Sequence, residues 1–109
     1  MRHLTWFGVL ALVVVPAAEE MFFRGVLYTT IKQRGYPRLA FWGTAVLFGA
    51  IHFNVAALLP LTFLALIFTW LYERTGNLLA PIAAHMVFNA VNFVALVADL
   101  PEWLEKTLK

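Results

Sequence analysis

Four apolar segments run along the chain and are separated by short polar stretches. They cover residues 4–31, 38–53, 55–72 and 78–100. A helix needs about 20 apolar residues to cross the hydrocarbon layer of a membrane, and only the second segment is short for that purpose. The separating stretches, at residues 32–38, Asn54 and 73–77, contain Gly, Pro or Asn, which favour chain reversal. The pattern predicts an all-α integral membrane bundle of about four transmembrane helices, forming a single domain over residues 1–109.

Composition supports this class and excludes several others. Apolar residues make up 62% of the 109 residues and charged residues only 13%, whereas soluble domains have about 25% charged residues. The sequence contains no cysteine, no serine and a single aspartate, Asp99. This excludes disulfide scaffolds, serine or cysteine nucleophiles and paired aspartates. The net charge of +2 comes from scattered basic residues and not from a long basic stripe. We therefore expect the chain to interact with a lipid bilayer and not with a nucleic acid.

The basic residues predict how the chain is oriented. Lys32, Arg34 and Arg38 follow the first segment, while the link at Asn54 carries no charge. Short loops rich in Lys and Arg stay in the cytoplasm, so we expect this loop and residues 73–77 to be cytoplasmic and both termini to lie outside. Residues 1–18 have an alternative interpretation as a secretory signal peptide, whose removal would leave the other segments unchanged.

Ionisable side chains lie inside the apolar segments, where they are costly and usually face a protein interior or a water-filled cavity. The ionisable residues are Glu19, Glu20, Arg24, His52 and His85, and the neutral amides Asn89 and Asn92 lie in the same apolar segments. Residues four apart share a helix face, so Glu20 is expected to pair with Arg24 and to leave Glu19 free for a cavity. By the same spacing, His85 and Asn89 share one face of the fourth segment.

The same residues also have a purely structural interpretation. The Glu20–Arg24 pair can lock two helices together. Asn89 and Asn92 can form hydrogen bonds between helices, and we favour that role for Asn92. Pro16 lies inside the first segment, where its missing N–H is expected to kink the helix or to free a backbone carbonyl.

The chemistry of these residue types suits hydrolysis of a peptide bond without a covalent intermediate. A carboxylate beside a neutral imidazole can take a proton from water and give it to a leaving amine. A second imidazole and a carboxamide can donate hydrogen bonds to the developing oxyanion. The alternative is a catalytic zinc ion on Glu19, His52 and His85, because two histidines and one carboxylate can bind zinc with an open position. The H-E-x-x-H pair of zinc proteases is absent.

Three short motifs occur in order along the chain, on the first, second and fourth apolar segments. They are E-E-x-x-x-R at residues 19–24, F-x-x-x-H at residues 48–52 and H-x-x-x-N at residues 85–89. In this combination, over about residues 4–93, the chain resembles the CAAX protease and bacteriocin-processing (CPBP, or Abi) family of intramembrane proteases. The resemblance implies an intramembrane endopeptidase that cleaves a membrane-anchored peptide or protein. We expect a multi-pass protein of a prokaryotic plasma membrane.

The resemblance also implies roles for the motif residues. These are activation of water by Glu19 and His52, an oxyanion site from His85 and Asn89, and support of that centre by Glu20 and Arg24. No metal is required in this scheme, and zinc is the alternative. A second possibility within the family is a non-proteolytic immunity or peptide-binding protein. Family members usually carry further helices before the first motif, so we expect such helices or a homodimer to complete the walls of the cavity.

Overall fold

The computed structural model describes residues 2–99 and 102–109, and all regular structure within these ranges is helical. The predicted all-α class is therefore confirmed. Three helices are long and apolar enough to cross a membrane, over Arg2–Gln33, Val55–Thr75 and Leu79–Ala98. They correspond to the first, third and fourth predicted segments.

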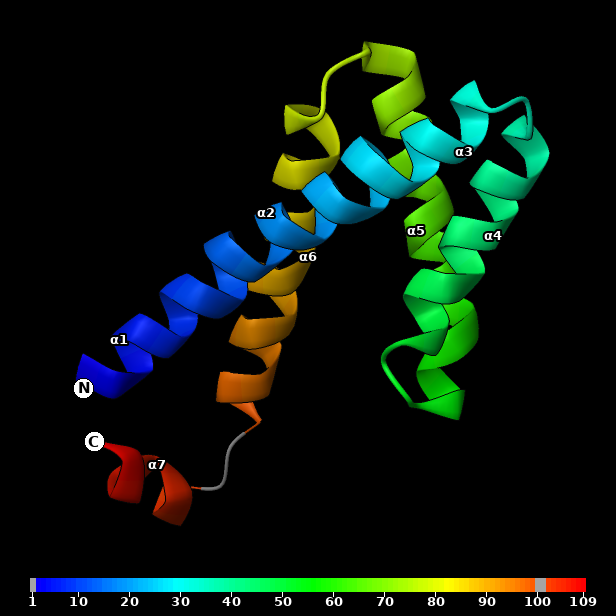
Figure 1. The fold of residues 1–109 in the computed structure, drawn as a ribbon. Coiled ribbons are helices and arrows are strands. Elements are labelled where there is room, and N and C mark those ends of the chain that lie inside the picture. The colour runs from blue at the N-terminus through cyan, green and yellow to red at the C-terminus, as the bar shows by residue number, and fades with distance from the viewer. Residues whose placement is uncertain (1, 100–101) are drawn as a thin grey trace.

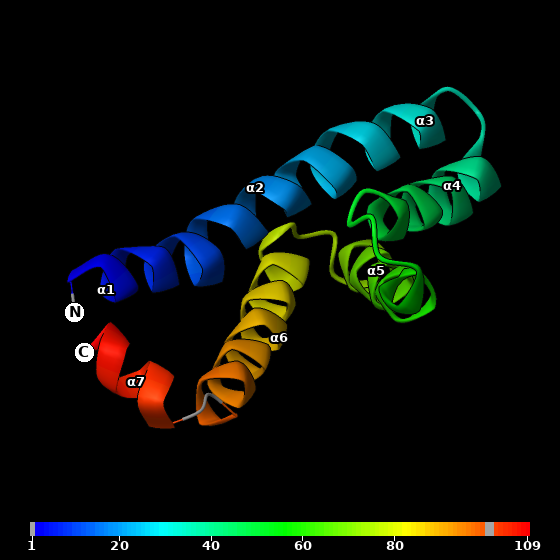
Figure 2. The ribbon, with the colours of Figure 1, turned by 90° about the horizontal axis from the view of Figure 1, so that it is seen from below.

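The first of these helices changes its type of turn several times along its 32 residues. It consists of α1 (Arg2–Val9), the π-helical η1 (Leu10–Val14), α2 (Val15–Glu20), the π-helical η2 (Met21–Tyr28) and α3 (Thr29–Gln33). At 1.5 Å per residue its length is about 48 Å, well beyond the roughly 30 Å of a hydrocarbon layer. A helix of this length fits a bilayer by tilting, and it lies obliquely across the other helices in Figures 1 and 2.

The remaining helices are α4 (Pro37–Ala50), α5 (Val55–Thr75), α6 (Leu79–Ala98) and the short α7 (Glu102–Leu108). The predicted segment 38–53 is helical only as far as Ala50, so His52 lies in the turn after α4. With 14 residues, α4 extends over about 21 Å, which is less than the thickness of a hydrocarbon layer. The bundle is thus formed by the first helix, α4, α5 and α6, with α4 as the short segment that the sequence indicated.

Turn residues determine where the helices end. Gly35 and Gly76 adopt positive φ angles of 97° and 61° after α3 and α5, a conformation that costs glycine little. The side chains of Asn54 and Asn77 each accept a hydrogen bond from the backbone N–H two residues later, at 3.0 and 2.9 Å, where α5 and α6 begin. The α3–α4 and α5–α6 turns lie at one end of the bundle and the α4–α5 turn lies at the other (Figure 1).

The core lies where η2, α4 and α5 meet. Its central cluster consists of Phe23, Ala45, Phe48 and Ala65. Small residues such as the two alanines let helix backbones approach closely, which is how helices associate in lipid. Large apolar side chains cover the outer faces, including Trp42, which is 57% exposed. Such a surface suits contact with lipid chains.

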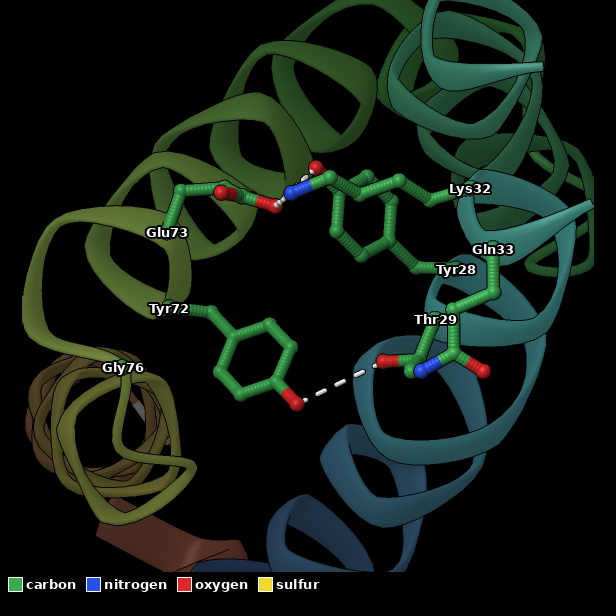
Figure 3. A pocket seen from close by; sticks show the side chains of 7 residues that line it. All are labelled: Tyr28, Thr29, Lys32, Gln33, Tyr72, Glu73 and Gly76. Carbon is green, nitrogen blue, oxygen red and sulfur yellow. Dashed lines mark hydrogen bonds and ion pairs between the residues drawn. The ribbon is translucent and has the colours of Figure 1, made fainter. Parts of the chain in front are cut away.

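Polar side chains connect the first helix to α5 at the end of the bundle where α3 and α5 end. Glu73 accepts hydrogen bonds from Tyr28 and Lys32, and the hydroxyls of Thr29 and Tyr72 lie 3.4 Å apart (Figure 3). These side chains line a cavity of about 330 Å³. The contacts join the end of the first helix to the end of α5.

Gly49 lies where α4 approaches α5 closely. A Cβ atom at this position would lie 2.5 Å from Thr62 Oγ1 and 2.8 Å from the backbone oxygen of Leu58. Gly49→Ala is therefore expected to push the helices apart and to lower the free energy of unfolding by about 1–3 kcal/mol. Gly43→Ala in the same helix is the control, because its nearest neighbour is the exposed side chain of Leu39 at 3.3 Å. Equilibrium unfolding in detergent micelles compares the variants, and equal stabilities would contradict the expected clash.

Candidate active site

Four of the predicted site residues meet between the first helix and α6. Glu19 and Glu20 end α2, Arg24 lies in η2, and His85 lies in α6. His85 Nδ1 is 2.9 Å from Glu20 Oε1, and His85 Nε2 is 3.5 Å from Glu19 Oε2. One imidazole is thus flanked by two carboxylates. We refer to these four residues as the Glu–His cluster.

The predicted pair of Glu20 and Arg24 is confirmed, with Arg24 Nη1 3.1 Å from Glu20 Oε1. Both residues are buried, with exposed fractions of 0% and 1%. Arg24 also donates to α5, from Nε to Thr69 Oγ1 at 3.2 Å and from Nη2 to the Ala65 carbonyl at 2.7 Å. A buried guanidinium is stable only when its donors have partners, and here one carboxylate and two groups of α5 provide them. The pair therefore also fixes the first helix against α5.

Two aromatic rings enclose the cluster. The centres of the Phe48 and Phe68 rings lie 5.1 and 5.4 Å from the guanidinium carbon of Arg24. Phe68 stacks on His85 with ring centres 4.9 Å apart, and Phe48 meets the same imidazole edge-on at 5.8 Å. By keeping water away, these rings strengthen the electrostatic interactions of Arg24 and His85 with the carboxylates.

The charges of the cluster divide into two parts. The guanidinium of Arg24 compensates the carboxylate of Glu20, and both side chains are buried. Glu19 is then the remaining acid of the cluster, with its Oε2 3.5 Å from His85 Nε2.

The environment of the two carboxylates differs. Glu19 is not paired with Arg24: its Oε2 lies 3.5 Å from His85 Nε2, and its side chain stays 26% exposed. Glu20 is inaccessible, and its Oε1 serves both Arg24 and His85. Within the described residues its Oε2 has no hydrogen-bond partner. Of the two acids, Glu19 is therefore the one that a water molecule or a substrate can reach.

His52 lies outside the Glu–His cluster. Its Nδ1 is 2.7 Å from the Phe48 carbonyl, and because a carbonyl only accepts, Nδ1 must be the protonated nitrogen. In the neutral ring Nε2 is then an acceptor. The Phe48 ring contacts both histidines, with its centre 5.1 Å from that of His52 and 5.8 Å from that of His85. The histidine in contact with Glu19 is thus His85, and the role implied for His52 in activating water stays a prediction.

The two asparagines of α6 behave differently. Asn89 Nδ2 donates to the carbonyl of Ala11 in η1 at 3.2 Å, which is a hydrogen bond between helices. Asn92 Nδ2 donates to the Phe88 carbonyl at 2.8 Å, within its own helix. The predicted interhelical role of Asn92 is therefore wrong, because this exposed side chain finds its acceptor one turn back in α6.

The donor set for a metal ion is not assembled. Across residues 2–99 and 102–109 no group of three or more His, Asp or Glu side chains is arranged to hold one. The alternative zinc ligands Glu19, His52 and His85 do not form such a group, since His52 lies in the turn after α4. We therefore derive no catalytic step through a metal.

Thr69 and Phe68 complete the site but were not among the residues that the sequence singles out. Threonine and phenylalanine are ordinary residues of an apolar helix, and neither belongs to a motif. The available signal is spacing: residues 65, 68 and 69 lie three and four apart and so share one face of α5. That face receives Arg24, but only the fold shows which helix supplies the arginine.

Similarity to known proteins extends over most of the chain. The family model described as type II CAAX prenyl endopeptidase Rce1-like matches residues 1–91. The "Uncharacterized protein YpbD" of Bacillus subtilis is 34% identical over 82 residues, which are 72% of this chain and 39% of that protein. The "Putative membrane peptidase YdiL" of the same organism is 28% identical over 94 residues, 86% of this chain and 38% of YdiL.

A third relative comes from another bacterium. The "UPF0177 protein YxdF" of Lactococcus lactis is 31% identical over 78 residues, 71% of this chain and 42% of that protein. The chain thus spans about two fifths of the length of these curated relatives. No solved structure matches it.

Proposed function

Because this chain belongs to the type II CAAX prenyl endopeptidase Rce1-like family, we propose that it is an intramembrane endopeptidase of a bacterial plasma membrane. It hydrolyses a peptide bond in a membrane-anchored protein or peptide. The long apolar helices support the location in a membrane, and the Bacillus and Lactococcus relatives support a bacterial one. The observation that carries the proposal is the His85 imidazole held between two carboxylates, one of them accessible.

Glu19 is the general base in this proposal. It takes a proton from water as the water oxygen attacks the substrate carbonyl carbon, and the negative charge passes from Glu19 to the new oxyanion. The same proton then moves to the amide nitrogen as the C–N bond breaks, which yields an acid and an amine and restores the carboxylate. A protonated His85 beside Glu19 balances the negative charge throughout these steps.

The other motif residues assist these steps. Glu20 accepts a hydrogen bond from His85 Nδ1 and so leaves Nε2 directed to Glu19. Asn89 uses one Nδ2 hydrogen on the Ala11 carbonyl, and we assign its second to the oxyanion. We assign His52 to orienting the water, because its Nε2 is an acceptor when Nδ1 donates to Phe48.

One observation favours a second candidate function. His52 lies outside the Glu–His cluster, so the complete set of motif side chains is not in contact. A non-proteolytic immunity or peptide-binding protein would need the polar centre only to hold a peptide. For both candidate functions, a second copy of the chain or further helices would complete the walls around the polar centre. The longer relatives have enough additional residues to form such helices.

The test is a cleavage assay with the protein reconstituted in liposomes. A panel of lipidated and transmembrane peptides is incubated in H₂¹⁸O with and without a chelator, and the products are identified by mass spectrometry. We expect one cut peptide bond, one ¹⁸O atom in the new carboxyl group and the same rate with the chelator. Binding of a peptide without cleavage would favour the immunity or peptide-binding function. Loss of cleavage on chelation, restored by zinc, would contradict the metal-free mechanism.

A further inference from the structure

The π-helical turn η1 leaves one backbone carbonyl without its helical partner. In this turn the N–H of Val15 bonds to the carbonyl of Leu10, five residues back. The next bond in the same register would run from residue 16 to Ala11, but residue 16 is Pro16 and has no N–H. Pro16 is itself buried, so water does not easily replace the missing donor. This explains the freed carbonyl that the sequence led us to expect.

Asn89 supplies the missing donor. Its Nδ2 lies 3.2 Å from the oxygen of Ala11, 78 residues away in the sequence. Proline is tolerated in membrane helices when a neighbouring side chain satisfies the freed backbone group. Asn89 is one turn beyond His85 on the same face of α6, so this bond and the two carboxylate contacts of His85 attach the same stretch of α6 to the first helix.

We propose that Pro16 keeps the Ala11 carbonyl open as a dedicated acceptor for Asn89, and that the resulting bond positions His85. Pro16 is then a positioning residue that acts through α6 and not through contact with substrate. The inference rests on the proposed function insofar as His85 serves catalysis, but the contact itself is independent of any activity. It also gives the π-helical turn a role, since α-helical hydrogen bonding would leave Ala11 with a backbone partner.

A double-mutant cycle tests the contact. Thermal unfolding in detergent compares the unaltered chain, Pro16→Ala, Asn89→Ala and the double variant. Alanine at position 16 lets a backbone N–H occupy the Ala11 carbonyl, so Asn89→Ala should lower Tm in the unaltered chain and much less in the Pro16→Ala background. Equal losses of Tm in the two backgrounds would overturn the proposal. Pro60→Ala, in the interior of α5, is the matched control and should leave the effect of Asn89→Ala unchanged.

Two further measurements separate positioning from a general loss of stability. Pro16→Ala should shift the ¹⁵N resonances of the His85 imidazole and lower kcat by roughly 10- to 100-fold with little change in KM, because small misplacements of reacting groups are costly. Pro60→Ala should do neither. Unchanged His85 resonances in Pro16→Ala would overturn the positioning role. If even the unaltered chain fails to cleave peptides, the proposed function fails, while the Tm cycle and the resonances still decide this inference.

Discussion

Glu19→Gln is expected to lower the rate of peptide cleavage by roughly 10²- to 10⁴-fold, the range that a positioned general base contributes. Glutamine preserves the size of the side chain but cannot take a proton from water. The substitution also removes the negative charge 3.5 Å from His85 Nε2, so the proposed balance of charge between these two side chains is lost. Because Glu19 is partly exposed and Glu20 keeps its pair with Arg24, we expect the variant to fold and to insert into membranes. Initial rates in liposomes measure the effect.

The matched control is Glu102→Gln, the same substitution at an acid of α7 whose side chain is 83% exposed. It should cleave at the rate of the unaltered chain. Helical circular dichroism and Tm of both variants establish that the comparison concerns chemistry and not folding. Cleavage by Glu19→Gln within a few-fold of the control would show that another group is the base.

The helical architecture was predictable because lipid leaves few alternatives to a helix for long apolar segments. The Glu20–Arg24 pair was predictable for a local reason, since residues four apart meet on any regular helix. The residue at which α4 ends was not predictable from the sequence. Apolar residues continue through Ile51 and Phe53, and Phe53 reverses the chain with a φ of 51° although no glycine or proline marks the position. Hydropathy alone therefore placed His52 on a helix that had already ended.

The contacts of the site depend on two features that the sequence pattern does not carry. The partners of His85 and Asn89 lie 65 and 78 residues away, so they follow only from how the first helix crosses α6. The π-helical turns of that helix add about one residue per turn and change which carbonyl is left open. Motif spacing could therefore indicate which residues matter, but not that Glu19 lies beside His85.

Arg24→Met is expected to lower the free energy of unfolding by about 3–5 kcal/mol, the usual cost of removing one partner of a buried ion pair. Methionine fills a similar volume, so the loss comes from charge and hydrogen bonds. Glu20 would keep a negative charge with an exposed fraction of 0%, and the Ala65 carbonyl and Thr69 hydroxyl would each lose a donor. Equilibrium unfolding in mixed micelles measures the change.

Replacing both partners tests whether the uncompensated charge is the cause. Glu20→Leu combined with Arg24→Met removes both charges, and apolar replacement of a buried pair is often neutral for stability. The double variant should therefore recover much of the loss, yet cleave poorly because His85 has lost the acceptor at Nδ1. Lys106→Ala breaks the Glu102–Lys106 pair, which has the same spacing but is exposed, and should leave stability unchanged within error. If Arg24→Met were equally harmless, Arg24 would not be compensating the buried carboxylate of Glu20.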